Sequence, residues 1–92
     1  MKTEFERRTE IEEMILENSV YTSIFKDCIF NYQWFMEASD DISETFGNGL
    51  LTGSEMALRT VLGIRAFDEQ GEKILRDLII EYYEKANEPR TF

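Results

Sequence analysis

The stretch 68–86, DEQGEKILRDLIIEYYEKA, decides the fold class of this chain. Its large apolar residues recur at steps of one, three and four, which places them on one face of a helix and the charged residues on the other. They are Ile74, Leu75, Leu78, Ile79 and Tyr82. Asp68 is a suitable N-cap, because its carboxylate can accept a hydrogen bond from an unpaired amide of the first turn. Pro89, with Asn87 just before it, predicts the end of this helix.

The N-terminal half of the chain carries the same periodicity. From Thr3 to Asn18 the apolar residues follow helical spacing and neither Gly nor Pro interrupts them. Asn18 and Ser19 can end this helix and cap a second one, which is predicted to reach about Ala38. Its apolar residues are Val20, Ile24, Cys28, Ile29, Tyr32, Phe35 and Met36. The β-branched and aromatic run Val20–Phe25 leaves a short strand as the alternative there.

Gly47-Asn48-Gly49 is the clearest break in the chain. Because Gly and Asn tolerate positive φ, Ser39–Gly49 is predicted to hold the end of the second helix and then a turn. Thr52-Gly53-Ser54-Glu55 fits a capping box, which predicts a short third helix from there to about Leu62, closed by Gly63. The expected fold is a single mainly α domain, residues 1–92, with about four helices and a short strand or hairpin as the alternative.

A chain of 92 residues has room for one thin hydrophobic core. Its hydrophobic content of 42% is too high for a disordered chain, and a single cysteine cannot form an intrachain disulfide. Self-association as a homodimer is therefore expected to reinforce the fold. Phe30 and Trp34, spaced i, i+4, fall away from the apolar stripe of the second helix and are the candidate dimer contact. The competing interpretation is that another helix of the same chain covers them.

Residues suited to catalysis are scarce. The chain has no histidine, and its only candidate nucleophile, Cys28, lies on an apolar stripe with no adjacent base. Carboxylate pairs are plentiful, but they form no calcium-binding loop, and the glycine triplet is not part of a phosphate-binding loop. We therefore expect no enzyme, no cofactor and no metal site. The N-terminus has no signal-peptide pattern, so a cytoplasmic location is expected, in the host cytoplasm if the chain is phage-encoded.

The charge balance restricts the partners. With 19 acidic and 10 basic residues the formal charge is −9, which opposes direct binding of nucleic acid or of an anionic membrane. A partner should instead be basic. Twelve of the acids fall into three rows, and the first and the last row have helical spacing. The rows are Glu6, Glu10, Glu13 and Glu17; Glu37, Asp40, Asp41 and Glu44; and Asp77, Glu81, Glu84 and Glu88.

Like charges at i, i+4 destabilise a helix by a few tenths of a kcal/mol per pair, so such rows call for a reason. Successive carboxylates lie about 5–6 Å apart, within about a factor of two of the 3.4 Å phosphate spacing along a DNA strand. A protein that binds DNA could thus bind such a rigid helix in place of a phosphate backbone. The competing interpretation is the ordinary solvated face of an amphipathic helix. An alternative function is an acidic immunity or antitoxin-like protein that blocks one toxin or enzyme through aromatic contacts.

In size, acidity and general character the whole chain, from Met1-Lys2-Thr3-Glu4 to Pro89-Arg90-Thr91-Phe92, resembles the Arn anti-restriction proteins of T-even bacteriophages. The resemblance implies a dimeric DNA mimic that protects phage DNA by occupying the DNA-binding surface of a host restriction endonuclease of the McrBC type. It also implies association with host nucleoid proteins. No residue roles are carried over with it, so the three acidic rows rest on the spacing alone.

Overall fold

The computed structural model describes residues 2–87, which form four helices and no strand. The helices are α1 (Glu4–Glu17), α2 (Ser19–Met36), α3 (Asp41–Leu62) and α4 (Glu69–Ala86). The mainly helical fold class is confirmed. The alternative of a strand at Val20–Phe25 is wrong, because the Asn18 side chain accepts hydrogen bonds from the amides of Val20 and Tyr21 and starts α2 there.

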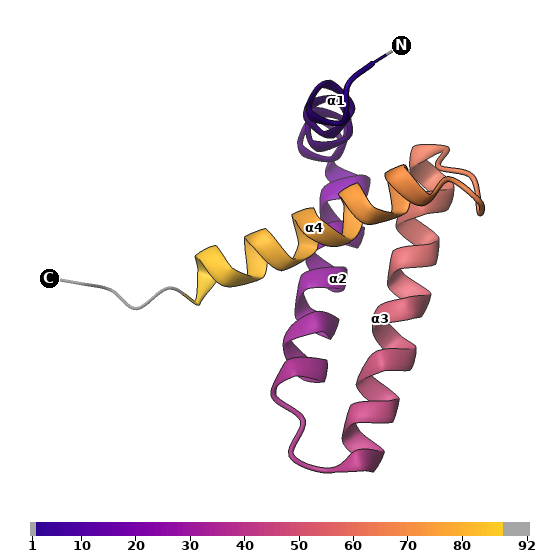
Figure 1. Cartoon of the computed structure of the whole chain (residues 1–92). Coiled ribbons are helices and arrows are strands. Elements are labelled where there is room, and N and C mark those ends of the chain that lie inside the picture. Colours follow the sequence, from indigo (N-terminus) through magenta and orange to yellow (C-terminus); the bar gives the residue numbers. More distant parts are fainter. Residues whose placement is uncertain (1, 88–92) are drawn as a thin grey trace, which may run out of the picture.

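Helices α2 and α3 form an antiparallel hairpin, closed by the short loop between Met36 and Asp41 (Figure 1). Helix α4 crosses one side of this hairpin, and α1 packs near its open end against α2 and α4. The smallest extent of the molecule is 24 Å, which corresponds to two helix diameters of about 10–12 Å each. Phe30, Trp34 and Phe46 of the hairpin remain exposed, so no other helix of the described chain covers the side on which they lie.

The core lies where all four helices meet. Cys28, Leu58 and Leu78 are completely buried, and they belong to one cluster. The other members of the cluster are Ile11, Ile15, Phe25, Leu62, Ile64, Ile74, Leu75 and Ile79. The rings of Phe25 and Tyr82 meet edge to face with 5.0 Å between their centroids, so aromatic packing joins α2 to α4.

The predicted stripe of α4 is confirmed, since four of its five residues are buried and Tyr82 is half-buried. The predicted caps on either side of the loop between α3 and α4 are confirmed as well. Gly63 adopts φ 74° after α3, and the Asp68 carboxylate accepts a hydrogen bond from the amide of Gly71. Helix α4 ends at Ala86, and the predicted stop at Pro89 lies outside the described residues.

The predicted turn at Gly47-Asn48-Gly49 is wrong, because α3 runs unbroken through these residues. The helix starts at Asp41 and is capped by Asp40, whose carboxylate accepts a hydrogen bond of 2.7 Å from the amide of Ser43. Gly47 has a packing role: a Cβ there would lie 3.1 Å from the backbone of Phe35, so its absence allows α3 to approach α2 closely. The predicted capping box at Thr52–Glu55 is wrong for the same reason, since it lies in the middle of α3.

Within residues 2–87, no helix combines the length and the apolar character needed to cross a bilayer.

Candidate functional site

The acidic row on α1 faces away from the core. Its four carboxylates are exposed, whereas Ile11 and Ile15 on the opposite side are buried. Two of the four have partners within the chain. Glu10 forms an ion pair of 2.6 Å with Lys2, and the Glu6 carboxylate accepts a hydrogen bond of 3.2 Å from the hydroxyl of Thr3, which caps the Glu6 amide. The other two, Glu13 and Glu17, form no ion pair within the described residues.

Glu17 stands at the unfavourable end of its helix, and Glu13 lies one turn before it. Glu17 is the last residue of α1, and the last turn contains no basic residue. The C-terminus of a helix carries a partial negative charge, so a carboxylate there is less stable than a cation by about 0.3–1 kcal/mol. No ion pair or hydrogen bond of their side chains within residues 2–87 accounts for these two acids.

The row at the closed end of the hairpin has a structural explanation. Asp40 is the N-cap of α3, and the hydrogen bond from the Ser43 amide lowers the pKa of its carboxyl group. Asp41 and Glu44 lie in the first turn of the same helix, where its dipole stabilises negative charge. Glu37 is exposed at the end of α2. These four acids are thus spread over a loop and two helix ends.

Basic residues neutralise much of the row on α4. Asp77 pairs with Lys73 at 3.2 Å, and Glu81 pairs with both Arg8 and Lys85. The hydrogen bond from Arg8, more than that from Lys85, lowers the pKa of Glu81. Glu84 is exposed without an ion pair in the described part of the chain, and Glu88 lies outside that part. This helix does not present a continuous negative line.

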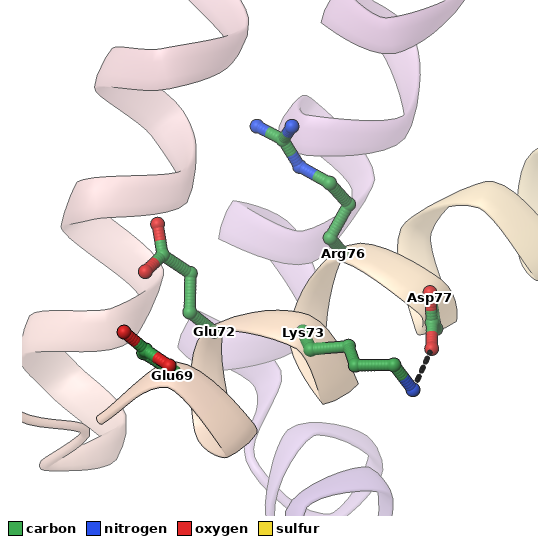
Figure 2. A pocket seen from close by; sticks show the side chains of 5 residues that line it. All are labelled: Glu69, Glu72, Lys73, Arg76 and Asp77. Atoms are coloured by element: carbon green, nitrogen blue, oxygen red, sulfur yellow. Dashed lines mark hydrogen bonds and ion pairs between the residues drawn. The ribbon is translucent and has the colours of Figure 1, made fainter. Parts of the chain in front are cut away.

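Figure 2 shows the same pairing in a shallow hollow of about 320 Å³ on the surface of α4. Lys73 reaches along the helix to Asp77, while Arg76 extends away from both. The remaining lining residues are Glu69 and Glu72. Three acids and two bases line the hollow, so its charge selects neither an anion nor a cation.

The three rows do not combine into one array. Figure 1 shows α1 close to end-on while α4 runs across the view, so the rows on these two helices point in different directions. The third row lies at the closed end of the hairpin, away from α1. The row on α1 is therefore the candidate site, because it lies along a single helix and two of its carboxylates, Glu13 and Glu17, form no ion pair among the described residues.

Cys28 lies in the core rather than in a site. Its side chain is completely buried, and this burial raises the pKa of the thiol to about 11. A thiol with such a pKa forms almost no thiolate at neutral pH. The described residues contain no group of three or more His, Cys, Asp and Glu side chains placed to hold a metal ion.

The exposed aromatic residues of α2 are part of a second surface. Phe30 is 66% exposed and Trp34 49% exposed, and the ring of Trp34 meets that of Phe46 on α3 edge to face at 5.4 Å. Phe46 thus covers one edge of Trp34, while Phe30 remains open. On α3 the exposed apolar residues continue with Ile42, Leu50 and Val61.

Sequence reasoning missed this part of the surface because it predicted a turn at residues 47–49. A signal was present: between Thr45 and Leu62 the only charged residues are Glu55 and Arg59. Both lie toward α4, where Glu55 pairs with Arg76 at 3.0 Å and Arg59 with Glu72 at 3.4 Å.

Comparisons with protein-family models, curated proteins and solved structures found no significant match to this chain.

Proposed function

We propose that this chain is a DNA mimic, an inhibitor that uses the acidic row of α1 to occupy the basic nucleic-acid-binding surface of another protein. One observation carries the proposal: Glu13 and Glu17 are exposed and have no cation partner among the described residues, and Glu17 also stands where the helix dipole disfavours it. A basic partner would remove that cost. The proposal is narrower than the expectation from sequence, because it uses one row and not three.

The dimensions of the row suit this role. From Glu6 to Glu17 the helix rises about 16 Å, which is the length of about five phosphates along one DNA strand. Four carboxylates over that length approach the charge density of the strand. Lys and Arg side chains of a DNA-binding surface could pair with them as they do with phosphates, so binding should weaken as the salt concentration rises.

The partner class follows from the charge and from the resemblance. A surface built for DNA is rich in Lys and Arg and is complementary to α1. The resemblance to the anti-restriction proteins makes a restriction endonuclease of the McrBC type the first candidate and nucleoid proteins the second. On this proposal the chain acts by binding and not by catalysis.

A competition experiment tests the proposal. Fluorescent duplex DNA is bound to purified endonuclease of the McrBC type, or to a nucleoid protein, and the chain is added at low and at high salt. We expect the chain to displace the duplex at low salt and to lose this ability as salt rises. The double variant Glu13→Lys/Glu17→Lys should lose displacement at both.

The matched control is Glu37→Lys/Glu84→Lys, which changes the net charge by the same amount at two exposed acids outside α1. It should displace the duplex nearly as well as the original chain. Equal loss in both double variants would mean that net charge alone is responsible. Full displacement by the α1 variant would overturn the proposal.

A second function is favoured by a different observation, the exposure of Phe30 and Trp34. In an immunity or antitoxin-like protein these rings would be the hot spots for one toxin or enzyme. Trp34→Ala would then abolish inhibition while the α1 charge reversal has little effect, and binding would resist salt.

A further inference from the structure

Three exposed aromatic rings lie together on the outer side of the α2–α3 hairpin, the side that α4 does not cross (Figure 1). The ring of Tyr32 on α2 meets Tyr83 of α4 edge to face. Phe30 and Trp34 are each two residues from Tyr32, about 200° around α2, so they point away from α4. On α3, Phe46 is 56% exposed and its ring meets that of Trp34. The three rings thus form one apolar surface.

Two carboxylates of α2 stand on either side of this surface. Asp27 is exposed one turn before Phe30. Glu37, the C-cap of α2, lines a hollow of about 230 Å³ together with Trp34. Neither carboxylate forms an ion pair within residues 2–87. The ten positions that separate them correspond to about 15 Å along the helix.

The outer side of the hairpin has an excess of negative charge. Asp40 adds a third carboxylate, which accepts hydrogen bonds from the amide and the hydroxyl of Ser43, another residue that lines the hollow. Lys26 is the only basic residue of α2. Arg59, the only basic residue of α3, lies toward α4, where it pairs with Glu72. One cation of the hairpin therefore stands against three carboxylates on this side.

The α3 part of this side is low beside the Phe30 ring. Asn31 donates a hydrogen bond of 3.1 Å to the hydroxyl of Ser54, which brings Gly53 to the level of Phe30. A Cβ at Gly53 would meet no atom of the chain within 4 Å, and the exposed residue one turn later is the small Ala57. Helices pack with about 8–10 Å between their axes, the closer distances being reached over small side chains. A helix of a partner can therefore approach α3 closely here.

We propose that the outer side of the hairpin binds a basic amphipathic helix of a partner protein. The apolar residues of that helix, at spacings of three and four, cover the three rings. Its Lys or Arg residues, about ten positions apart, pair with Asp27 and Glu37. This surface goes beyond the proposed function, because it includes no residue of the acidic row on α1.

Charge selects this occupant over the others. A second copy of the chain would bring a further set of the same carboxylates to the surface, and like charges at an interface are unfavourable. Nucleic acid and anionic lipid would be repelled for the same reason. A neutral apolar helix would leave Asp27 and Glu37 without partners. Only a cationic helix satisfies both the rings and the two acids.

The exposed area also fits a single helix. At about 200 Å² for a whole aromatic side chain, the three rings expose roughly 340 Å² of apolar surface. A standard interface between two globular proteins buries about 800 Å² on each partner, which is more than twice as much. One helix that covers the rings should therefore bind with a dissociation constant of the order of 10 μM.

The test is a titration of a dye-labelled synthetic helix of about 18 residues with the full chain, followed by fluorescence anisotropy. The peptide carries Leu at spacings of three and four on one face and two Lys about ten positions apart. Two further peptides are the controls: one has the same composition with the Leu residues spread around the helix, and one has Glu in place of both Lys. Each should bind at least about tenfold more weakly. Equal binding of either control would overturn the proposal, and so would a Lys peptide that does not bind.

Variants of the chain locate the binding surface. Phe30→Ser should weaken binding of the Lys peptide by about tenfold or more, because it removes an exposed ring from the centre of the surface. Phe67→Ser is the matched control, since Phe67 is 96% exposed in the loop between α3 and α4, and it should bind normally. Circular dichroism should be unchanged in both variants.

A matched pair of charge reversals separates this surface from the α1 row. Asp27→Lys/Glu37→Lys should weaken binding of the Lys peptide by about tenfold or more and leave displacement of duplex DNA intact. Glu13→Lys/Glu17→Lys should have the opposite pattern. Equal weakening of peptide binding by both reversals would overturn the proposal, as net charge alone would then explain it. Sedimentation equilibrium that shows a dimer of the chain, dissociated by Phe30→Ser, would assign the surface to a second copy and overturn it as well.

Discussion

Gly47 and Gly49 lie two positions apart in α3 and have opposite surroundings. A Cβ on Gly47 would be 3.1 Å from the backbone of Phe35, whereas a Cβ on Gly49 would meet nothing. Alanine is the better helix former at both positions, so only the surroundings differ. The pair separates the role of glycine in helix packing from its intrinsic cost.

We predict that Gly49→Ala raises the free energy of unfolding by about 0.5–1 kcal/mol and that Gly47→Ala lowers it. The physical reason for the second effect is that the backbone of α2 has to move away from the new methyl group. Urea unfolding, followed by circular dichroism, measures both changes. Equal effects at the two positions would contradict the packing role of Gly47.

Asp68 links α1 to the start of α4. Its carboxylate accepts a hydrogen bond of 2.8 Å from Arg7 and caps the Gly71 amide at 3.0 Å. The hydrogen bond from Arg7, with that from Gly71, lowers the pKa of Asp68 from 3.8 to about 2. Because the folded-state pKa is lowered, the stabilisation is fully present above about pH 4 and is lost as the pH falls toward 2.

We therefore predict that Asp68→Asn is less stable than the original chain at neutral pH, and that the difference shrinks between pH 4 and pH 2. The amide of Asn keeps the capping oxygen, so the variant isolates the pairing with Arg7. Thermal unfolding at a series of pH values measures the effect. A stability difference that does not change with pH would show that the pairing contributes nothing.

At the scale of the helices, α3 and α4 are joined by an ion pair between unequally exposed partners. The Glu55 side chain is only 9% exposed, whereas Arg76 is 54% exposed. One oxygen of Glu55, Oε1, is buried without a hydrogen-bond partner among the described residues. Removing the cation would leave a buried carboxylate, which is costlier than removing both partners.

We predict that Arg76→Ala destabilises the fold by about 1–3 kcal/mol and that Glu55→Gln in the same chain restores part of the loss. The double variant has no buried charge to compensate. A double-mutant cycle of urea unfolding measures the coupling. Lys26→Ala, at an exposed residue of α2 without an ion pair in the described chain, is the control and should change stability little.

The elements also show how far the sequence alone could lead. The starts of α1, α2 and α4 and the end of α3 were predicted because their signals are local: a capping side chain and an apolar stripe for the first three, and Gly63 for the end of α3. The start of α3 was missed because Gly47 reads as a turn residue, and its real role depends on Phe35 in another helix. The capping box at Thr52 had correct local chemistry, but Asp40 already caps that helix.

The candidate site, like the helices, was predictable from the sequence only in part. The row on α1 follows from helical spacing alone, so it was predictable. The neutralisation of the α4 row was only partly so: Lys73 and Lys85 are close in sequence, but Arg8 is 73 residues away from Glu81. Contacts at that separation become visible only when the fold is known.

At the scale of the whole molecule, the formal charge of −9 opposes the compact state. Carboxylates without an ion pair among the described residues lie on α1, at the closed end of the hairpin, and at Asp27, Glu69 and Glu84. Four of the eight ion pairs of this part of the chain are exposed and individually weak. Screening should reduce repulsion more than it weakens these pairs.

We predict that the melting temperature of the chain rises with moderate salt, because salt screens the repulsion between its carboxylates. Differential scanning calorimetry over a series of salt concentrations measures the change. A fall in the melting temperature would mean that the ion pairs matter more than the repulsion.

The position of Trp34 has a practical consequence. It is the only tryptophan of the chain, half-exposed on the outer side of the hairpin and in contact with Phe46. Indole emission depends on the polarity around the ring, so any molecule that covers this side should shift its fluorescence to shorter wavelength. The protein thus contains its own optical reporter for that side, whereas binding confined to the distant carboxylates should leave the emission unchanged.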